Sequence, residues 1–260
     1  MTPATDVRVA LSLGRRSIRQ AFRRPQFLAP LVIFPSLMLA VNTGGAGRAT
    51  ELPGFPNVHG FLDFELAGAM LQSGMLAGVS GGIALALDFE IGFIDRLFAA
   101  PISRYTILAA RVIATAVMGL LTGLWFLVGG LIFGAHIEGG VPGALVILLL
   151  SCLAAGAFGG LASALAIGAG KASVVQGIFP LVFVILFLST AFFPEALLLE
   201  PARTIARLNP LSLIVEGLRG PIVGDLTAAD VGKALGGIAI VGVVGLTLST
   251  LTLRARERRG

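Results

Sequence analysis

The stretch VPGALVILLLSCLAAGAFGGLASALAIG, residues 141–168, decides the fold because none of its side chains is charged. A helix needs about twenty consecutive apolar residues to cross the hydrocarbon core of a bilayer, and this stretch is longer. Inside lipid its backbone must be helical, because every unpaired peptide group costs several kcal/mol. The stretch therefore predicts a transmembrane helix.

Five further apolar segments accompany this one, so we expect an all-α polytopic membrane protein with six transmembrane helices. Of the 260 residues, 56% are hydrophobic and 13% are charged, whereas soluble domains carry about 25% charged residues. No repeat or linker divides the chain, and residues 1–260 are expected to form a single membrane domain. The expected spans are residues 27–43, 62–87, 105–135, 141–168, 172–193 and 232–253.

The basic residues are unevenly distributed, and their distribution predicts the orientation of the chain. If both termini, residues 88–104 and the turn at Lys171 share one side, that side, together with Arg111 near the start of the third span, carries fourteen of the nineteen basic residues. Cytoplasmic segments of membrane proteins are enriched in Lys and Arg. We therefore expect a multi-pass protein of the plasma membrane with both termini in the cytoplasm. The net charge of +5 then reflects topology, and no nucleic acid partner is expected.

Residues 1–26 contain an arginine-rich amphipathic stretch, RRSIRQAFRR, that is typical of a helix at a membrane surface. A cleaved signal peptide is the alternative, because a basic start, a short apolar core and small residues near GGAGRA fit that pattern loosely. Pro30 and Pro35 in the apolar core and the long basic region argue against it. Sequencing the mature N-terminus would decide between the two.

The segment DFEIGFIDRLFAAPISR, residues 88–104, interrupts the apolar chain between the second and third expected spans. As a helix over residues 88–98, it places Asp88 and Asp95 on a polar arc and its apolar side chains on the remaining arc. Glu90 lies in the apolar arc and needs a cation or a hydrogen-bond donor. We expect an amphipathic helix at the membrane surface that ends before Pro101. The alternative is a loop whose acids balance its arginines.

No motif predicts catalysis on this chain. LAIGAGKAS resembles a phosphate-binding loop, but Leu165 replaces the first glycine and Ala172 replaces the Ser or Thr. His59 and His136 have no partners at metal-ligand spacing, so no metal site is expected. The fourth span has no ionisable group of the kind that ion-coupled carriers place near the midplane. A membrane enzyme, a stand-alone channel and a secondary carrier are therefore the weaker alternatives.

The order of these features resembles the ABC-2 type permeases, membrane subunits of ATP-driven exporters that include the daunorubicin-resistance type. The resemblance covers the basic N-terminus before a proline-bearing span, residues 88–104, the tight turn at Lys171 and LNPLSLIVEGLRG before the last span. It implies that the N-terminal stretch is an elbow helix and that residues 88–104 form a coupling helix docking on a separate cytoplasmic ATPase. By position, that contact would comprise Glu90, Gly92, Asp95, Arg96, Leu97, Pro101 and Arg104.

The resemblance also implies the partners and the direction of transport. Two permease chains, identical or homologous, would pair within the lipid bilayer. Two copies of the ATPase would bind ATP and magnesium, so this chain would be non-catalytic and would hold no cofactor. The assembly would export an amphipathic drug, lipid or metabolite. A polysaccharide exporter of the same superfamily is the alternative, but it would be expected to need an aromatic-lined channel, and this chain has one Trp and one Tyr.

Side chains of the second and fifth spans could line the cargo path, because these spans face the dimer interface in related exporters. The members from the fifth span share one helical face, and Pro180 in that span predicts a kink. Packing or lipid contact is the alternative explanation for the same residues. The candidates are Gln72, Ser73, Met75, Gln176, Phe179, Phe183 and Phe187.

Overall fold

The computed structural model describes residues 3–23, 25–99 and 103–257, and every regular element among them is a helix. The expected all-α fold is thus confirmed for the described residues. Within these ranges, five helices are long and apolar enough to cross a bilayer. They are α2 (Pro25–Ala46), α3 (Phe61–Glu90), α5 (Arg104–Ile132), α6 (Gly140–Ala169) and α11 (Ala228–Glu257).

The segment expected to form the fifth span differs from the prediction. It folds as two short helices, α7 (Ala172–Gly177) and α8 (Phe179–Phe187), that meet at Ile178. Together they cover Ala172–Phe187, which is shorter than the roughly twenty residues of a typical span. Pro180 lies in the first turn of α8, where its missing N–H breaks no helical hydrogen bond. The predicted kink is therefore a break in the helix just before Pro180.

Short helices occupy the segments between the long ones. The N-terminal stretch forms α1 (Pro3–Phe22), which confirms the predicted amphipathic helix. One face of α1 packs against α5, and Gly14 of α1 lies buried near the carbonyl of Ala110. The predicted surface helix therefore also contacts protein. The remaining short helices are η1 (Gly47–Glu51), α4 (Phe93–Ala99), η2 (Glu195–Leu197), α9 (Ala202–Leu208) and α10 (Pro210–Val223).

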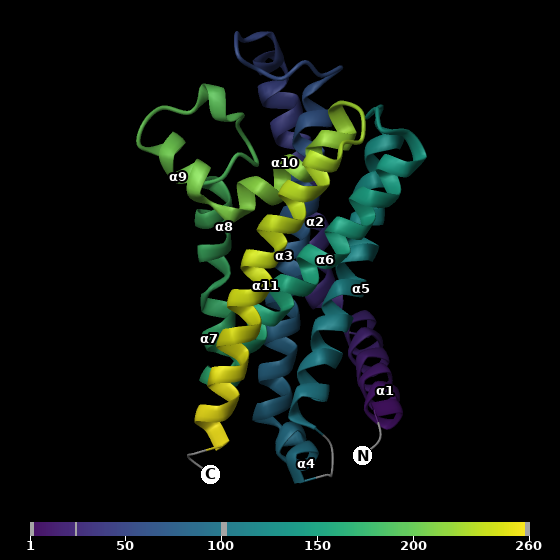
Figure 1. Cartoon of the computed structure of the whole chain (residues 1–260), viewed down its shortest axis with the longest axis vertical. Coiled ribbons are helices and arrows are strands. Elements are labelled where there is room, and N and C mark those ends of the chain that lie inside the picture. Colours follow the sequence, from purple (N-terminus) through teal and green to yellow (C-terminus); the bar gives the residue numbers. More distant parts are fainter. Residues whose placement is uncertain (1–2, 24, 100–102, 258–260) are drawn as a thin grey trace.

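The helices form an elongated bundle with α3 at its centre (Figure 1). Helices α2, α5, α6 and α10 all pack on α3, and α11 packs along α6 and α10. Helix α4, the start of α1 and the end of α11 lie at one end of the bundle, which we call the α4 end. The loop around η1, α9 and the α10–α11 turn lie at the opposite end, the α9 end. The helices nearest the two termini and α4 thus share one end, in agreement with the charge distribution.

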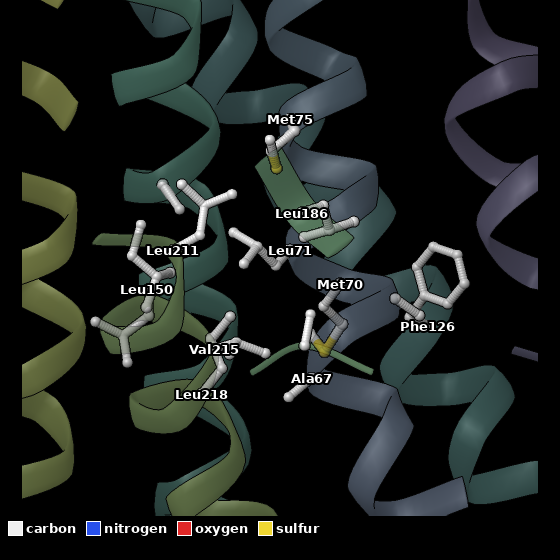
Figure 2. Packing of buried hydrophobic residues seen from close by; sticks show 14 of the residues in the cluster. Ala67, Met70, Leu71, Met75, Phe126, Leu150, Leu186, Leu211, Val215 and Leu218 are labelled. Atoms are coloured by element: carbon white, nitrogen blue, oxygen red, sulfur yellow. The ribbon is translucent and has the colours of Figure 1, made fainter. Parts of the chain in front are cut away.

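The buried core lies where α10 docks between α3 and α6 (Figure 2). Leu211, Val215 and Leu218 of α10 are all at most 4% exposed and contact the core formed by α3 and α6. On α3, Leu71 belongs to this cluster, and on α6, Leu150 does. Helix α10 is too short to span a bilayer, so its apolar face is buried by the bundle itself.

Helices α3 and α6 approach each other closely because glycines line their contact. A Cβ atom added at Gly78 would lie 2.6 Å from the Cβ of Phe158, and one at Gly82 would lie 2.8 Å from the Cβ of Ala162. Membrane helices achieve such proximity where one of them has only a hydrogen as its side chain. The α3–α6 contact therefore fixes α3 within the bundle and positions its two ends.

Candidate functional site

The prediction of a single helix over residues 88–98 is wrong, because α3 continues through Asp88 and ends at Glu90. Gly92 then adopts the left-handed conformation, with φ of +67°, and its N–H donates to the carbonyl of Phe89 at 2.9 Å. A glycine in this conformation ends a helix and redirects the chain at no steric cost. Helix α4 starts only at Phe93. Asp88 and Glu90 consequently belong to the bundle helix α3.

Asp88 is fully buried, which corrects its predicted position on a polar surface arc. Its carboxylate accepts hydrogen bonds from Arg111 of α5 and from Arg16 of α1, the latter at 3.2 Å. The side chains of Asp88, Arg111 and Arg16 are 0%, 7% and 38% exposed. A buried carboxylate requires such partners, because leaving it unpaired costs several kcal/mol. We call these three residues the Asp88 cluster; it joins α1, α3 and α5.

Helix α4 is attached directly to this cluster. The guanidinium of Arg16 lies 3.8 Å from the centroid of the Phe93 ring, a cation–π contact. Ile94 is 1% exposed, and Leu97 lies beside Leu13 of α1. Phe93, Ile94 and Leu97 of α4 are therefore at least partly covered by the protein, whereas the sequence had predicted that a membrane surface would cover them.

Glu90 forms a second connection at the same end of α3. Its Oε1 atom accepts the backbone N–H of Ala172, the first residue of α7, at 2.8 Å. The first N–H groups of a helix have no partner within the helix, so an acceptor from outside stabilises that end. The sequence predicted that Glu90 needs a donor, and the structure provides a backbone N–H. The end of α3 is thus tied to α7 as well as to α1 and α5.

The structure describes most of the residues that the resemblance assigned to the ATPase contact. Glu90 and Gly92 form the α3–α4 turn, and Arg96 and Leu97 follow on α4, Arg96 exposed and Leu97 half-buried. These four residues lie together at the α4 end of the bundle. Pro101 and the side chains of Asp95 and Arg104 lie outside the described residues.

The candidate cargo residues do not line a common space within one chain. Gln72, Ser73 and Met75 are at most 4% exposed in the core, and the Ser73 hydroxyl donates to the carbonyl of Leu31 at 2.7 Å. Phe183 is half-buried, with its ring 4.9 Å from that of Phe34 in α2. The other members differ in exposure: Phe179 is half-buried, and Gln176 and Phe187 are exposed.

Arg219 of α10 is a buried cation that sequence analysis missed. Its Nε donates to the carbonyl of Phe64 at 3.0 Å, and its Nη2 donates to the carbonyls of Thr190 and Ala191 at 3.1 and 3.0 Å. The guanidinium also lies 3.7 Å from the centroid of the Phe64 ring. Burial lowers the pKa of Arg219, and the neighbouring charges of Glu65 and Glu216 oppose that effect. Its position four residues after Val215 and eight after Leu211, on the apolar face of the same helix, was the available signal.

At the α9 end, the two histidines lie together although the sequence gave no reason to pair them. Their ring centroids are 4.7 Å apart, and His59 Nε2 lies 2.8 Å from Glu138 Oε1. The backbone N–H of His136 donates to Asp63 at 2.9 Å. Among the described residues, no three His, Cys, Asp or Glu side chains are arranged to hold a metal ion. This group therefore links the loop before α3 to the turn between α5 and α6.

Comparison with known proteins agrees with a transport role. The sequence profile of the ABC-2 type transporter family matches residues 9–223, which include the Asp88 cluster, Glu90 and Arg219. Two curated proteins named "Putative transport permease ycf38", from Porphyra purpurea and Pyropia yezoensis, are similar to this chain. Each is 27% identical over 215 residues, covering 80% of this chain and 72% of the relative.

Proposed function

The chain belongs to the ABC-2 type transporter family, and from this premise we propose that it forms the export path of a transporter driven by a separate cytoplasmic ATPase. Two copies of the ATPase bind ATP and magnesium, and a second permease chain, identical or homologous, completes the path. This chain is a transport permease of the membrane and supplies the path and the mechanical connection. Hydrolysis takes place on the partner.

The observation that carries this proposal is the position of two carboxylates at the end of α3. Asp88 holds α1 and α5, and two residues later Glu90 holds α7. A displacement of α4, as coupling helix, by the ATPase would therefore reach α1 through Arg16 and Phe93, and α7 through Glu90. Docking of the ATPase at the α4 end would thus move several helices of the bundle together.

The proposed topology has six crossings with both termini in the cytoplasm. Five are made by the long helices, and the fifth crossing in chain order is made by α7 and α8 with the turns that follow them. Helix α1 is the elbow helix, and the α4 end faces the cytoplasm because the segments that carry most of the basic residues of the sequence include α1, α4 and the end of α11. The location is the plasma membrane.

The proposed cargo is an amphipathic drug, lipid or metabolite that moves between two permease chains. Gln176 and Phe187 are exposed on α7 and α8 and are free to meet a second chain, with Phe179 and Phe183 behind them. Binding of ATP draws the two ATPases together, and the interface between the permeases switches between inward and outward access. Such switching requires two packings of similar free energy.

Purification of the tagged full chain from its native cells tests the ATPase partnership. The wild-type chain is expected to retain an ATP-binding subunit that mass spectrometry identifies and that hydrolyses ATP in the complex. Glu90→Ala and Asp95→Arg are expected to reduce the amount of bound ATPase. The matched control is Asp225→Asn, which replaces an exposed carboxylate after α10 at the α9 end. This variant should leave the amount of bound ATPase unchanged. A chain that transports without any bound ATPase would instead be a stand-alone channel or carrier.

A further inference from the structure

Arginines follow one side of α1 and its last turn. Arg8, Arg15 and Arg19 are separated by seven and then four residues, which places them within about 40° of one another around the helix. Arg23 continues the line one turn later, where its backbone N–H donates to the carbonyl of Arg19 at 3.1 Å. All four side chains are exposed, and none takes part in an ion pair with another described residue. We call them the α1 arginine stripe.

The opposite side of α1 is covered by the bundle. Gly14 is buried near the carbonyl of Ala110 in α5. Ser17 and Ala21 are half-buried against the bundle and, like Gly14, lie roughly 120–180° around the helix from the first arginine of the stripe. An amphipathic helix that lies freely on a membrane buries its apolar face in the lipid and turns its cations towards water. In α1 the protein covers that face instead, so the stripe points sideways out of the bundle.

The place of α1 on the bundle brings the stripe to the headgroup layer of the bilayer. Figure 1 shows α1 beside the part of α5 nearest the α4 end, and the two helices pack together. The 29 residues of α5 extend over about 44 Å, whereas the hydrocarbon core is about 30 Å thick. Gly14 contacts Ala110, only about 9 Å from the start of α5. Phe22, 57% exposed, lies about 40° from Arg8 around α1, and aromatic rings on a basic helix are typical of this interface.

Charge separates a lipid headgroup from the other neighbours that α1 could have. A second copy of the chain would bring the same cations to a two-fold contact, where like charges repel. The ATPase would approach from beyond the helix ends at the α4 end, whereas the stripe faces sideways, towards the surrounding lipid. Phosphate is the anion that the headgroup layer supplies, and a guanidinium can bind it through two parallel hydrogen bonds.

We propose that the α1 arginine stripe binds the phosphate groups of anionic phospholipids. The leaflet that supplies them rests on the proposed orientation, which makes it the cytoplasmic one, whereas the chemistry of binding does not depend on it. The lipids hold the outer side of α1, while Arg16 on its flank holds Asp88 of α3. Anionic lipid therefore favours the packing of α1 on α5 and keeps the Asp88 cluster assembled.

Native mass spectrometry of the purified full chain in neutral detergent tests the site, with either phosphatidylglycerol or phosphatidylcholine of the same acyl chains added. The wild-type chain is expected to retain phosphatidylglycerol at concentrations at which phosphatidylcholine is lost. The triple variant Arg8→Gln, Arg15→Gln, Arg19→Gln is expected to bind phosphatidylglycerol roughly 100-fold more weakly. Its binding of phosphatidylcholine should stay as in the wild type. If the triple variant does not fold, Arg15→Gln alone is expected to weaken binding of phosphatidylglycerol roughly fivefold.

A matched control removes the same charge elsewhere on the chain. The triple variant Arg48→Gln, Arg207→Gln, Lys233→Gln changes three exposed cations at the α9 end and should retain phosphatidylglycerol as the wild type does. Equal loss of the lipid in this control, or full binding by the stripe variant, would overturn the proposal. Displacement of the lipid by an equal concentration of inorganic phosphate would also overturn it, because the stripe would then be a site for any phosphate.

The ATPase provides the last comparison. Lipid binding is measured on the purified chain alone, so a failure to find an ATPase would count against the proposed function and leave this site standing. Co-purification of the ATPase with the stripe variant is expected to match the wild type. A stripe variant that kept phosphatidylglycerol but lost the ATPase would assign the stripe to the ATPase contact and would overturn the proposal.

Discussion

Asp88 of α3 and Arg111 of α5 form an ion pair in which neither side chain is more than 7% exposed. The pair is completed by Arg16 of α1, which is partly exposed and lies against α4. A buried pair of this kind contributes little when both partners are present, but the loss of one partner leaves an isolated buried charge. The cluster therefore makes α1, α3 and α5 depend on one carboxylate.

Asp88→Asn is expected to destabilise the chain by about 3 kcal/mol, because Arg111 then keeps its charge without a buried partner. Thermal unfolding of the purified protein in detergent measures the loss. The control is Glu138→Gln, whose pair with His59 is exposed, at 44% and 64%, and should cost less than about 1 kcal/mol. Similar unfolding temperatures for the two variants would show that the Asp88 cluster does not stabilise the bundle.

Two replacements of Glu90 distinguish the effect of its hydrogen bond on ATPase binding from the effect of its charge. Glu90→Gln keeps an oxygen for the N–H of Ala172 and removes the charge, whereas Glu90→Ala removes both. We expect the Gln variant to bind the ATPase nearly as well as the wild type and the Ala variant to bind it poorly. Co-purification of the ATPase measures both. Equal loss in the two variants would mean that the partner contacts the charge itself.

Gly78 and Gly82, at the contact between α3 and α6, are expected to tolerate no side chain. Gly78→Ala places a Cβ atom 2.6 Å from the Cβ of Phe158 and should destabilise the protein by about 1–3 kcal/mol. Gly129→Ala in α5 is the matched control, because nothing lies within 4 Å of its added Cβ. Alanine there favours the helix by up to about 1 kcal/mol. Thermal unfolding should therefore move in opposite directions for the two variants.

Arg219→Lys is expected to loosen the α9 end although it keeps the charge. Lysine cannot reproduce a planar group that contacts Phe64, Thr190 and Ala191 together, so about 2 kcal/mol of local stability is lost. Limited proteolysis and amide hydrogen exchange of residues 189–209 report the change. Arg207→Lys, in an exposed pair with Glu195, should leave both measurements as in the wild type. If amide hydrogen exchange in Arg219→Lys matched the wild type, Arg219 would not be holding the chain after α8 against the bundle.

The proposed orientation is tested by labelling single cysteines with a membrane-impermeant maleimide, in a Cys152→Ser background. Asp225→Cys at the α9 end is expected to react in intact cells. Lys171→Cys, at the turn between α6 and α7, is expected to react only after the membrane is permeabilised. The reverse pattern would place the α4 end outside the cell and would contradict the positive-inside distribution.

The long spans were predictable because hydrophobic length alone determines them. Residues 141–168 and α6 differ by only one residue at each end. The break near Pro180 also follows from local chemistry, since proline cannot donate a helical hydrogen bond. By contrast, a helical wheel assumes a continuous helix. The prediction therefore continued the amphipathic helix through Gly92. In the structure, the left-handed conformation of Gly92 ends α3 there.

The partners of each side chain in the candidate site could not be predicted, because they lie far apart in the chain. Arg16 and Arg111 lie 72 and 23 positions from Asp88, and only the docking of α1 and α5 brings them together. The partner of Glu90 is a backbone N–H, which no side-chain pattern reveals. Arg219 was missed for a similar reason: all three of its acceptors are backbone carbonyl groups, one of Phe64 in α3 and two in the irregular chain after α8.

The spacing of Asp88 and Glu90 restricts the motions that are open to α3. Two residues correspond to about 200° around a helix, so the two carboxylates point in nearly opposite directions. Rotation of α3 about its own axis would pull one carboxylate away from its partners whichever way the helix turned. A tilt of the whole helix that carries α1, α5 and α7 with it keeps the bonds of both carboxylates. The bundle is thus built to pivot as a unit and to resist torsion.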